Sequence, residues 1–147
     1  MPDRILIVDD EPAYAQALTE RLVLRGYAAR ACTDPAEAIR QIQAEAVAVV
    51  ILDLVMPEID GIEVLRHIKR SRPLTEVILL TGHASPGSAV EGMRQGIFDY
   101  LTKDSTIESI SKKIDAALAC FTAHQDRIQK AREALDPREP TPEDDPW

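Results

Sequence analysis

The chain has 147 residues, the size of one domain, and its 45% hydrophobic and 29% charged residues describe a globular protein. The net charge of −8 argues against a nucleic-acid footprint, which needs a basic face, and against docking on anionic lipid. The longest apolar run, residues 46–52, is too short to span a bilayer, and no secretory signal pattern opens the chain. We therefore expect a cytoplasmic protein with no membrane partner.

The first half of the chain alternates apolar runs with helix patterns. Residues 4–8 form an apolar, β-branched run, typical of a strand buried on both faces. A helix over 11–25 is expected to end at Gly26, and a weaker strand candidate covers 27–32.

A second unit of helix and strand follows. Asp34 is predicted to cap the next helix, with Pro35 in its first turn and Glu37 three residues after the cap. Residues 47–52 then form a second strongly apolar strand.

The next unit begins at a turn marked by Asp60 and Gly61, before a helix that ends near Pro73. A strand is predicted over 77–80. The helix that we expect over 88–96 has poor intrinsic propensity because it contains glycine.

The last strand is predicted over 98–101, and Ser105 with Glu108 predicts the capped start of a long final helix. Strands and helices thus alternate five times, which implies right-handed crossovers and a parallel sheet with helices on both faces. Residues 136–147 contain four prolines and carry five acids against one base, so we expect a disordered acidic tail.

Polar side chains stand at the carboxyl ends of four predicted strands. In chain order they are Asp9, Asp10, Asp53, Thr81 and Lys103. Ligands bind at this edge of an open parallel sheet, so we expect the five side chains to converge there. Three carboxylates in one place repel one another, and a hard divalent cation such as Mg²⁺ relieves that repulsion.

The chemistry of this set describes a site for a phosphoryl group. Asp53 is the natural nucleophile, because an aspartyl phosphate is a known covalent form of this side chain. Lys103 supplies a mobile positive charge for a phosphoryl oxygen, and Thr81 supplies a hydroxyl donor. Each residue alone has an ordinary structural interpretation, such as a turn or helix cap for Asp53, but all of them together favour a site.

The chain resembles the receiver (CheY-like) domain of two-component response regulators, over roughly residues 3–120. The segments that carry the resemblance are LIVDDE, VVILDLVMPEIDG, LLTGHAS and FDYLTK. It implies an α/β, flavodoxin-like, three-layer (βα)5 fold with a parallel five-stranded sheet in the order 2-1-3-4-5. We divide the chain into a receiver domain at 1–120, a helical extension at 121–135 and the tail at 136–147.

The resemblance also implies roles for the residues at the strand ends. Asp53 corresponds to the phosphoacceptor, Asp10 to a direct Mg²⁺ ligand, and Asp9 to an acid that acts mainly through water. The backbone carbonyl of Val55 corresponds to the third protein ligand of Mg²⁺. The implied reaction is in-line phosphoryl transfer to Asp53 from a histidine kinase or a phosphotransfer protein.

Further roles concern switching and dephosphorylation. Thr81 corresponds to the switch hydroxyl, Tyr100 to the aromatic ring that swings inward with it, and Lys103 to the cation that bonds the phosphoryl group. Val55 and His83 stand where the family tunes hydrolysis of the aspartyl phosphate. Because an apolar Val55 cannot align water, we predict a long phosphoryl lifetime.

One position departs from the family pattern. The family usually has proline after the lysine, often with a cis peptide bond, and this chain has Asp104. A cis bond before a residue other than proline costs roughly 3 kcal/mol, so we expect a trans bond here. Asp104 also adds a negative charge near Lys103, and both changes bear on how Lys103 is placed.

The final helix repeats apolar residues at a spacing typical of coiled coils. They are Ile107, Ile114, Phe121, Ile128 and Leu135, with Ile110, Ala117, His124 and Ala131 at the second heptad position. In one interpretation the part beyond Phe121 forms a homodimer or docks on a kinase. In the other it is an amphipathic extension without a partner, because His124 interrupts the second heptad position.

The remaining cysteine and histidine residues are predicted to have no chemical role. Cys32 and Cys120 are too few for a disulfide framework and have no metal-ligating neighbour in the sequence, so we expect free thiols. His67 and His124 lie on predicted helices, and we expect both to be exposed.

We therefore predict a stand-alone response regulator, which is not an enzyme but a phosphoacceptor that assists its own phosphorylation and dephosphorylation. Its output passes to an unknown protein target, without direct DNA binding. One alternative is a phosphorylation-independent interaction module on the same fold. An aspartate-nucleophile phosphatase is less favoured, because Val55 replaces the second aspartate of those enzymes. A dinucleotide or flavin carrier lacks its glycine-rich loop after the first strand.

Overall fold

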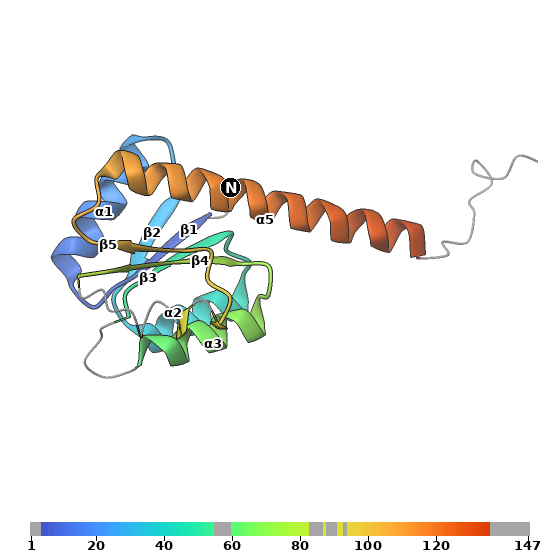
Figure 1. The fold of residues 1–147 in the computed structure, drawn as a ribbon, viewed down its shortest axis with the longest axis horizontal. Helices are drawn as coiled ribbons and strands as arrows, with labels where there is room; N and C mark the ends of the chain where they lie inside the picture. The colour runs from blue at the N-terminus through green and yellow to red at the C-terminus, as the bar shows by residue number, and fades with distance from the viewer. Residues whose placement is uncertain (1–3, 55–59, 83–86, 88–90, 93, 136–147) are drawn as a thin grey trace, which may run out of the picture.

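The structure is a computed structural model, and it describes residues 4–54, 60–82, 87, 91–92 and 94–135 (Figure 1). Five parallel strands form one sheet in the order β2-β1-β3-β4-β5. Their bounds are Ile5–Val8 (β1), Ala29–Cys32 (β2), Val49–Leu52 (β3), Glu76–Thr81 (β4) and Asp99–Thr102 (β5). The predicted sheet and strand order are confirmed, although β2 begins later than predicted and β5 is shifted by one residue.

Helices cover both faces of this sheet, which gives the predicted three layers. Their bounds are Pro12–Leu24 (α1), Pro35–Ala44 (α2), Gly61–Ser71 (α3) and Ile107–Leu135 (α5). In Figure 1, α1 and α5 lie on one face, and α2 and α3 lie on the other. Gly87, Glu91, Gly92 and Arg94 are helical, in or beside the helix predicted over 88–96, whereas its predicted first residue Ser88 lies outside the described residues.

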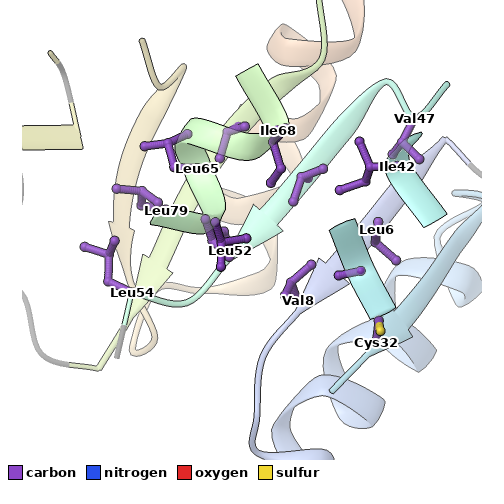
Figure 2. Close-up of a cluster of buried hydrophobic side chains, with 14 residues drawn as sticks. Leu6, Val8, Cys32, Ile42, Val47, Leu52, Leu54, Leu65, Ile68 and Leu79 are labelled. Carbon is purple, nitrogen blue, oxygen red and sulfur yellow. The ribbon is translucent and has the colours of Figure 1, made fainter. Parts of the chain in front are cut away.

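The apolar strands are buried on both sides, as their continuous hydrophobic runs predict. Alternate residues of each strand enter different core clusters. In β1, Leu6 and Val8 join the cluster that packs against α2 and α3 (Figure 2), while Ile5 and Ile7 face α1 and α5. The same alternation recurs in β3 and β4, so these three strands form the buried centre of the protein.

Local sequence signals set most helix ends. The Asp34 carboxylate accepts a hydrogen bond from the Ala36 N–H at 3.0 Å, and Asp60 caps α3 in the same way through the Ile62 N–H. Gly26 follows α1 with φ of +97°, a conformation that favours glycine. The predicted cap of the last helix was wrong by one residue: the Thr106 hydroxyl, not Ser105, accepts the Ser109 N–H.

The last helix has two unlike halves. In the half that lies on the sheet, Ile110, Ile114, Ala117 and Phe121 are buried. The second half runs on past the body of the protein, as Figure 1 shows, and Leu135 is 81% exposed. Over the described residues, none of the helices combines the length and the apolar character needed to cross a membrane.

Candidate functional site

Three carboxylates meet at the carboxyl end of the sheet, as predicted. Asp9 and Asp10 follow β1, Asp53 follows β3, and their ligand oxygens all lie within 4.8 Å of one another. They converge because β1 and β3 are paired neighbours, with Val8 beside Leu52 in the register. Asp9 and Asp53 are buried, and Asp10 is half-buried. We call this cluster of three aspartates the acidic pocket, and Asp10 is its most exposed member.

The Lys103 ammonium lies among these acids. Its Nζ is 2.7 Å from Asp9 Oδ2 and 3.1 Å from Asp53 Oδ2. Only 13% of the lysine side chain is exposed, against 3% for each aspartate. Two buried carboxylates close together need a positive charge, and Lys103 supplies it in this structure.

Burial and pairing act in opposite directions on the ionisation of these groups. Burial alone would lower the pKa of Lys103, but the hydrogen bonds and charges of Asp9 and Asp53 outweigh it and hold that pKa above its ordinary value. Burial raises the pKa of Asp9, although Lys103 and the Glu11 N–H, which donates at 2.9 Å, pull it down. Lys103 therefore stays charged across the physiological range, and burial makes the charge on Asp9 costly.

Two further residues lie beside the Lys103 ammonium, and they were not among the predicted site residues. Glu11 Oε1 lies 3.2 Å from Lys103 Nζ, and the centroid of the Tyr14 ring lies 4.6 Å from it, within cation–π range. Glu11 directly follows Asp9 and Asp10 in the sequence, and this position could have indicated that it lies near the site. Tyr14 faces the site because α1 begins at Pro12 and so turns this residue toward Lys103. The spacing of apolar residues alone does not specify where the helix begins.

A close backbone approach supports the site from behind. A Cβ atom on Gly61 would lie 2.6 Å from Leu54 Cα and 3.0 Å from the Asp53 carbonyl oxygen, so only glycine fits. The Gly61 N–H donates to the Leu54 carbonyl at 3.3 Å. The Asp60-Gly61 pair, predicted as a turn, therefore also sets how closely α3 packs behind Asp53.

The predicted switch residues lie on the two strands beyond β3. Thr81 ends β4 and is fully buried, and its carbonyl accepts the Lys103 N–H at 2.9 Å. Tyr100 lies in β5, paired with Leu79, and packs partly buried against the core under α2 and α3. Val55 and His83, predicted as metal-ligand and tuning positions, lie outside the described residues.

The departure at Asp104 has a clear local outcome. The peptide bonds of the described ranges are all trans, including the bond between Lys103 and Asp104, as predicted. Asp104 is exposed, and its carboxylate accepts a hydrogen bond from the Thr102 hydroxyl. Lys103 meanwhile reaches the buried acids, so the change from proline leaves its side chain in the pocket.

The sequence model of the response regulator receiver domain matches residues 5–115, which include the whole sheet and every residue of the acidic pocket. The chain belongs to this receiver domain family. It is similar to the transcriptional regulatory protein GlrR of Escherichia coli (strain K12), with 36% identity over 139 residues. That alignment covers 95% of this chain but 31% of the relative, so the chain spans about a third of that protein.

Solved receiver structures have the same fold. A CheY-like receiver domain protein from Methanospirillum hungatei JF-1 aligns with a TM-score of 0.79 and 27% identity, covering 83% of this chain and 98% of that one. A response regulator protein from Burkholderia pseudomallei, solved with a phosphorylated aspartic acid, calcium ion and citrate, aligns with a TM-score of 0.69 and 28% identity. This alignment covers 90% of the present chain and 74% of the other.

The donor set of the pocket fits a hard divalent cation. Mg²⁺ takes oxygen ligands and commonly uses one or two carboxylates together with water. Asp9, Asp10 and Asp53 offer three carboxylates at one point, and Asp10 is half-buried.

Proposed function

We propose that this receiver accepts a phosphoryl group on Asp53 from a histidine kinase or a phosphotransfer protein, and signals through a protein partner. One observation carries the proposal. The buried Asp53 carboxylate lies 3.1 Å from the Lys103 ammonium and shares the acidic pocket with Asp9 and Asp10. A nucleophilic carboxylate, a cation and a metal-ligand set in one place are the parts that phosphoryl transfer requires.

The transfer itself is a simple displacement. A carboxylate oxygen of Asp53 attacks phosphorus, the phosphorus–nitrogen bond of the phosphohistidine breaks, and the imidazole leaves with the electron pair. Lys103 then pairs with a phosphoryl oxygen in place of the Asp53 oxygen that it contacts at rest. Mg²⁺ held by Asp9, Asp10 and Asp53, with the Val55 carbonyl, would offset the negative charge that develops on the phosphoryl oxygens.

Switching follows from residues on β4 and β5. The Thr81 hydroxyl turns toward the phosphoryl group, and the partly buried Tyr100 ring moves inward with it. The surface between Gly82 and Tyr100 changes as a result, and the partner reads that change. The Burkholderia pseudomallei relative supports this proposal, because its structure contains a phosphorylated aspartic acid and a divalent cation.

The deciding experiment is the intact mass of the full chain after incubation with Mg²⁺ and acetyl phosphate. The parent is expected to gain one phosphoryl group, and Asp53→Asn none. Asp126→Asn, which removes an exposed carboxylate on α5, is the matched control and should be labelled like the parent. A folded parent that binds Mg²⁺ yet gains no phosphoryl group would support the phosphorylation-independent module instead.

For the helical extension we propose a homodimer formed by α5 against α5 of a second copy. Ile114 and Phe121 are buried against the sheet, but Ile128 and Leu135 of the same seven-residue repeat are 39% and 81% exposed. Exposed apolar residues at heptad spacing are the pairing surface of a coiled coil.

Sedimentation tests the dimer. The full chain is expected to sediment as a dimer, and the double variant Ile128→Glu with Leu135→Glu as a monomer. Thr122→Glu, at another exposed position of the helix, should leave the dimer intact. Identical monomers for the full chain and a chain cut after Cys120 would end the dimer proposal.

A further inference from the structure

A second cluster of metal-ligand side chains lies at the opposite end of β4. Glu76, Cys120 and His124 each offer one ligand atom, and the three atoms lie within 4.8 Å of one another. Glu76 begins β4, whereas Thr81 ends it at the acidic pocket, about 16 Å away at the usual rise of a strand. The two clusters are therefore separate.

The fold brings these three residues together from distant parts of the chain. Cys120 and His124 are four residues apart on α5, so they lie on the same side of that helix. Glu76 shares the face of β4 that α5 covers, because Ile78 and Leu80 of that face pack in the α5 core cluster. The Cys120 thiol lies 3.8 Å from Glu76 Oε1 and donates toward it.

Two sequence-based expectations are corrected at this point. His124 is half-buried, not exposed, because it lies where α5 still faces the start of β4. Cys120 has metal-ligating neighbours after all, one a helical turn away and one 44 residues earlier in the chain. The other expectations are confirmed: Cys32 and Cys120 are both free thiols, and His67 is exposed.

The donor types define the class of ion. One thiolate, one imidazole and one carboxylate form a mixed sulfur, nitrogen and oxygen set, which suits Zn²⁺ and its first-row neighbours better than Mg²⁺. Two ligands four residues apart on one helix, with a third from another element, form a recurring Zn²⁺ arrangement. Ligand atoms around a tetrahedral Zn²⁺ are roughly 3.5 Å apart. Small side-chain rotations would bring the ligand atoms of Glu76, Cys120 and His124 to that spacing.

Two cations border the cluster. Lys69 Nζ donates to the carbonyls of Pro73 and Thr75, at 3.0 and 2.9 Å. It is close enough to Glu76 and Cys120 for their charges to interact. A nitrogen of Arg127 lies 2.6 Å from His124 Nδ1. Arg127 is exposed, and its flexible side chain can leave the imidazole free to bind an ion.

We propose that Glu76, Cys120 and His124 form a binding site for Zn²⁺ or a similar first-row divalent ion, with water in the fourth position. Cys120 binds as the thiolate, and its proton passes to solvent. The bound ion joins the start of β4 to α5 close to the point where that helix leaves the body. This site is independent of phosphorylation at Asp53, because it uses none of the same residues.

Titration of the full chain with Co²⁺ tests the proposal, because thiolate ligation to Co²⁺ gives a charge-transfer absorption band. Excess Mg²⁺ in the buffer occupies the acidic pocket. The band is expected at one ion per chain, to disappear in Cys120→Ser, and to persist in Cys32→Ala, which removes the other thiol. His124→Ala should lower the affinity for Co²⁺, and for Zn²⁺ in competition, by about tenfold or more. His67→Ala should leave both affinities unchanged.

Several outcomes overturn the proposal. They are a parent chain without the band, a band lost in Cys32→Ala rather than in Cys120→Ser, and a band abolished by Asp53→Asn. Circular dichroism of each variant checks that the chain is folded, which we expect because Cys120 and His124 lie at the edge of the core. If Cys120→Ser fails to fold, the affinities of Glu76→Gln and His124→Ala for Zn²⁺ test the proposal instead, and both should be lower than that of the parent.

Discussion

The two ends of β4 carry clusters that arise in different ways. At the carboxyl end, each residue of the cluster directly follows a strand, so the sequence alone predicts which side chains meet. At the amino end, Glu76 meets two residues of α5 that come more than forty positions later. The first cluster follows from topology alone, whereas the second depends on which side of a helix faces the sheet.

The clusters also differ in how their charges are balanced. In the acidic pocket, Lys103 contacts two buried aspartates directly. Around Cys120, one carboxylate is accompanied by a thiol and an imidazole, so little charge needs to be offset before an ion binds. Changes at the carboxyl end should therefore have the larger effect on stability.

Removing the Lys103 ammonium is expected to have the largest effect. Lys103→Met removes the ammonium that contacts the buried Asp9 and Asp53 carboxylates, and we expect the free energy of unfolding to fall by about 2–3 kcal/mol in urea without Mg²⁺. Added Mg²⁺ should reduce that loss, since it replaces the missing positive charge. Lys130→Met, at an exposed position of α5, is the control. A loss that Mg²⁺ leaves unchanged would contradict this account.

Adding one methyl group behind the acceptor is expected to be the next largest change. Gly61→Ala places a Cβ 2.6 Å from Leu54 Cα, and we expect a loss of about 2 kcal/mol from overpacking. Gly87→Ala meets no atom within 4 Å and should change stability by less than about 0.5 kcal/mol. Equal effects of the two substitutions in urea unfolding would show that the contact behind Asp53 is unimportant.

The start of α5 gives a smaller effect. Thr106→Ala removes the hydroxyl that accepts the Ser109 N–H, and should cost about 1 kcal/mol. Ser105→Ala, at the cap predicted from the sequence, should cost less than about 0.5 kcal/mol. Thermal unfolding of the two variants measures the difference, and the reverse order would restore the prediction made from the sequence.

The last prediction concerns the rate of dephosphorylation. Val55→Asn provides a polar group that can align water, so the phosphorylated variant should lose its phosphoryl group faster than the parent. The decline of the phosphorylated mass with time, after removal of the phosphodonor, measures it. Identical rates would show that Val55 does not lengthen the phosphoryl lifetime.

Sequence reasoning predicted the sheet, its order and the members of the acidic pocket, since apolar runs and strand-end residues state them directly. It located helix caps well where a side chain and a proline agreed, as at Asp34. It placed the cap of α5 at Ser105 because Glu108 follows at the spacing of a capping box, whereas the turn geometry makes Thr106 the residue that accepts the Ser109 N–H. It missed Tyr14 and His124 because their roles depend on the rotation of a helix about its axis.

The uneven burial of α5 has a mechanical consequence. The fourteen residues beyond Phe121 extend for about 21 Å at the rise of an α-helix. A tilt of about 5° at the buried half would therefore displace Leu135 by roughly 2 Å. The exposed end of α5 therefore moves about the segment between Ile114 and His124. Any ligand that stiffens this segment limits how far Leu135 moves.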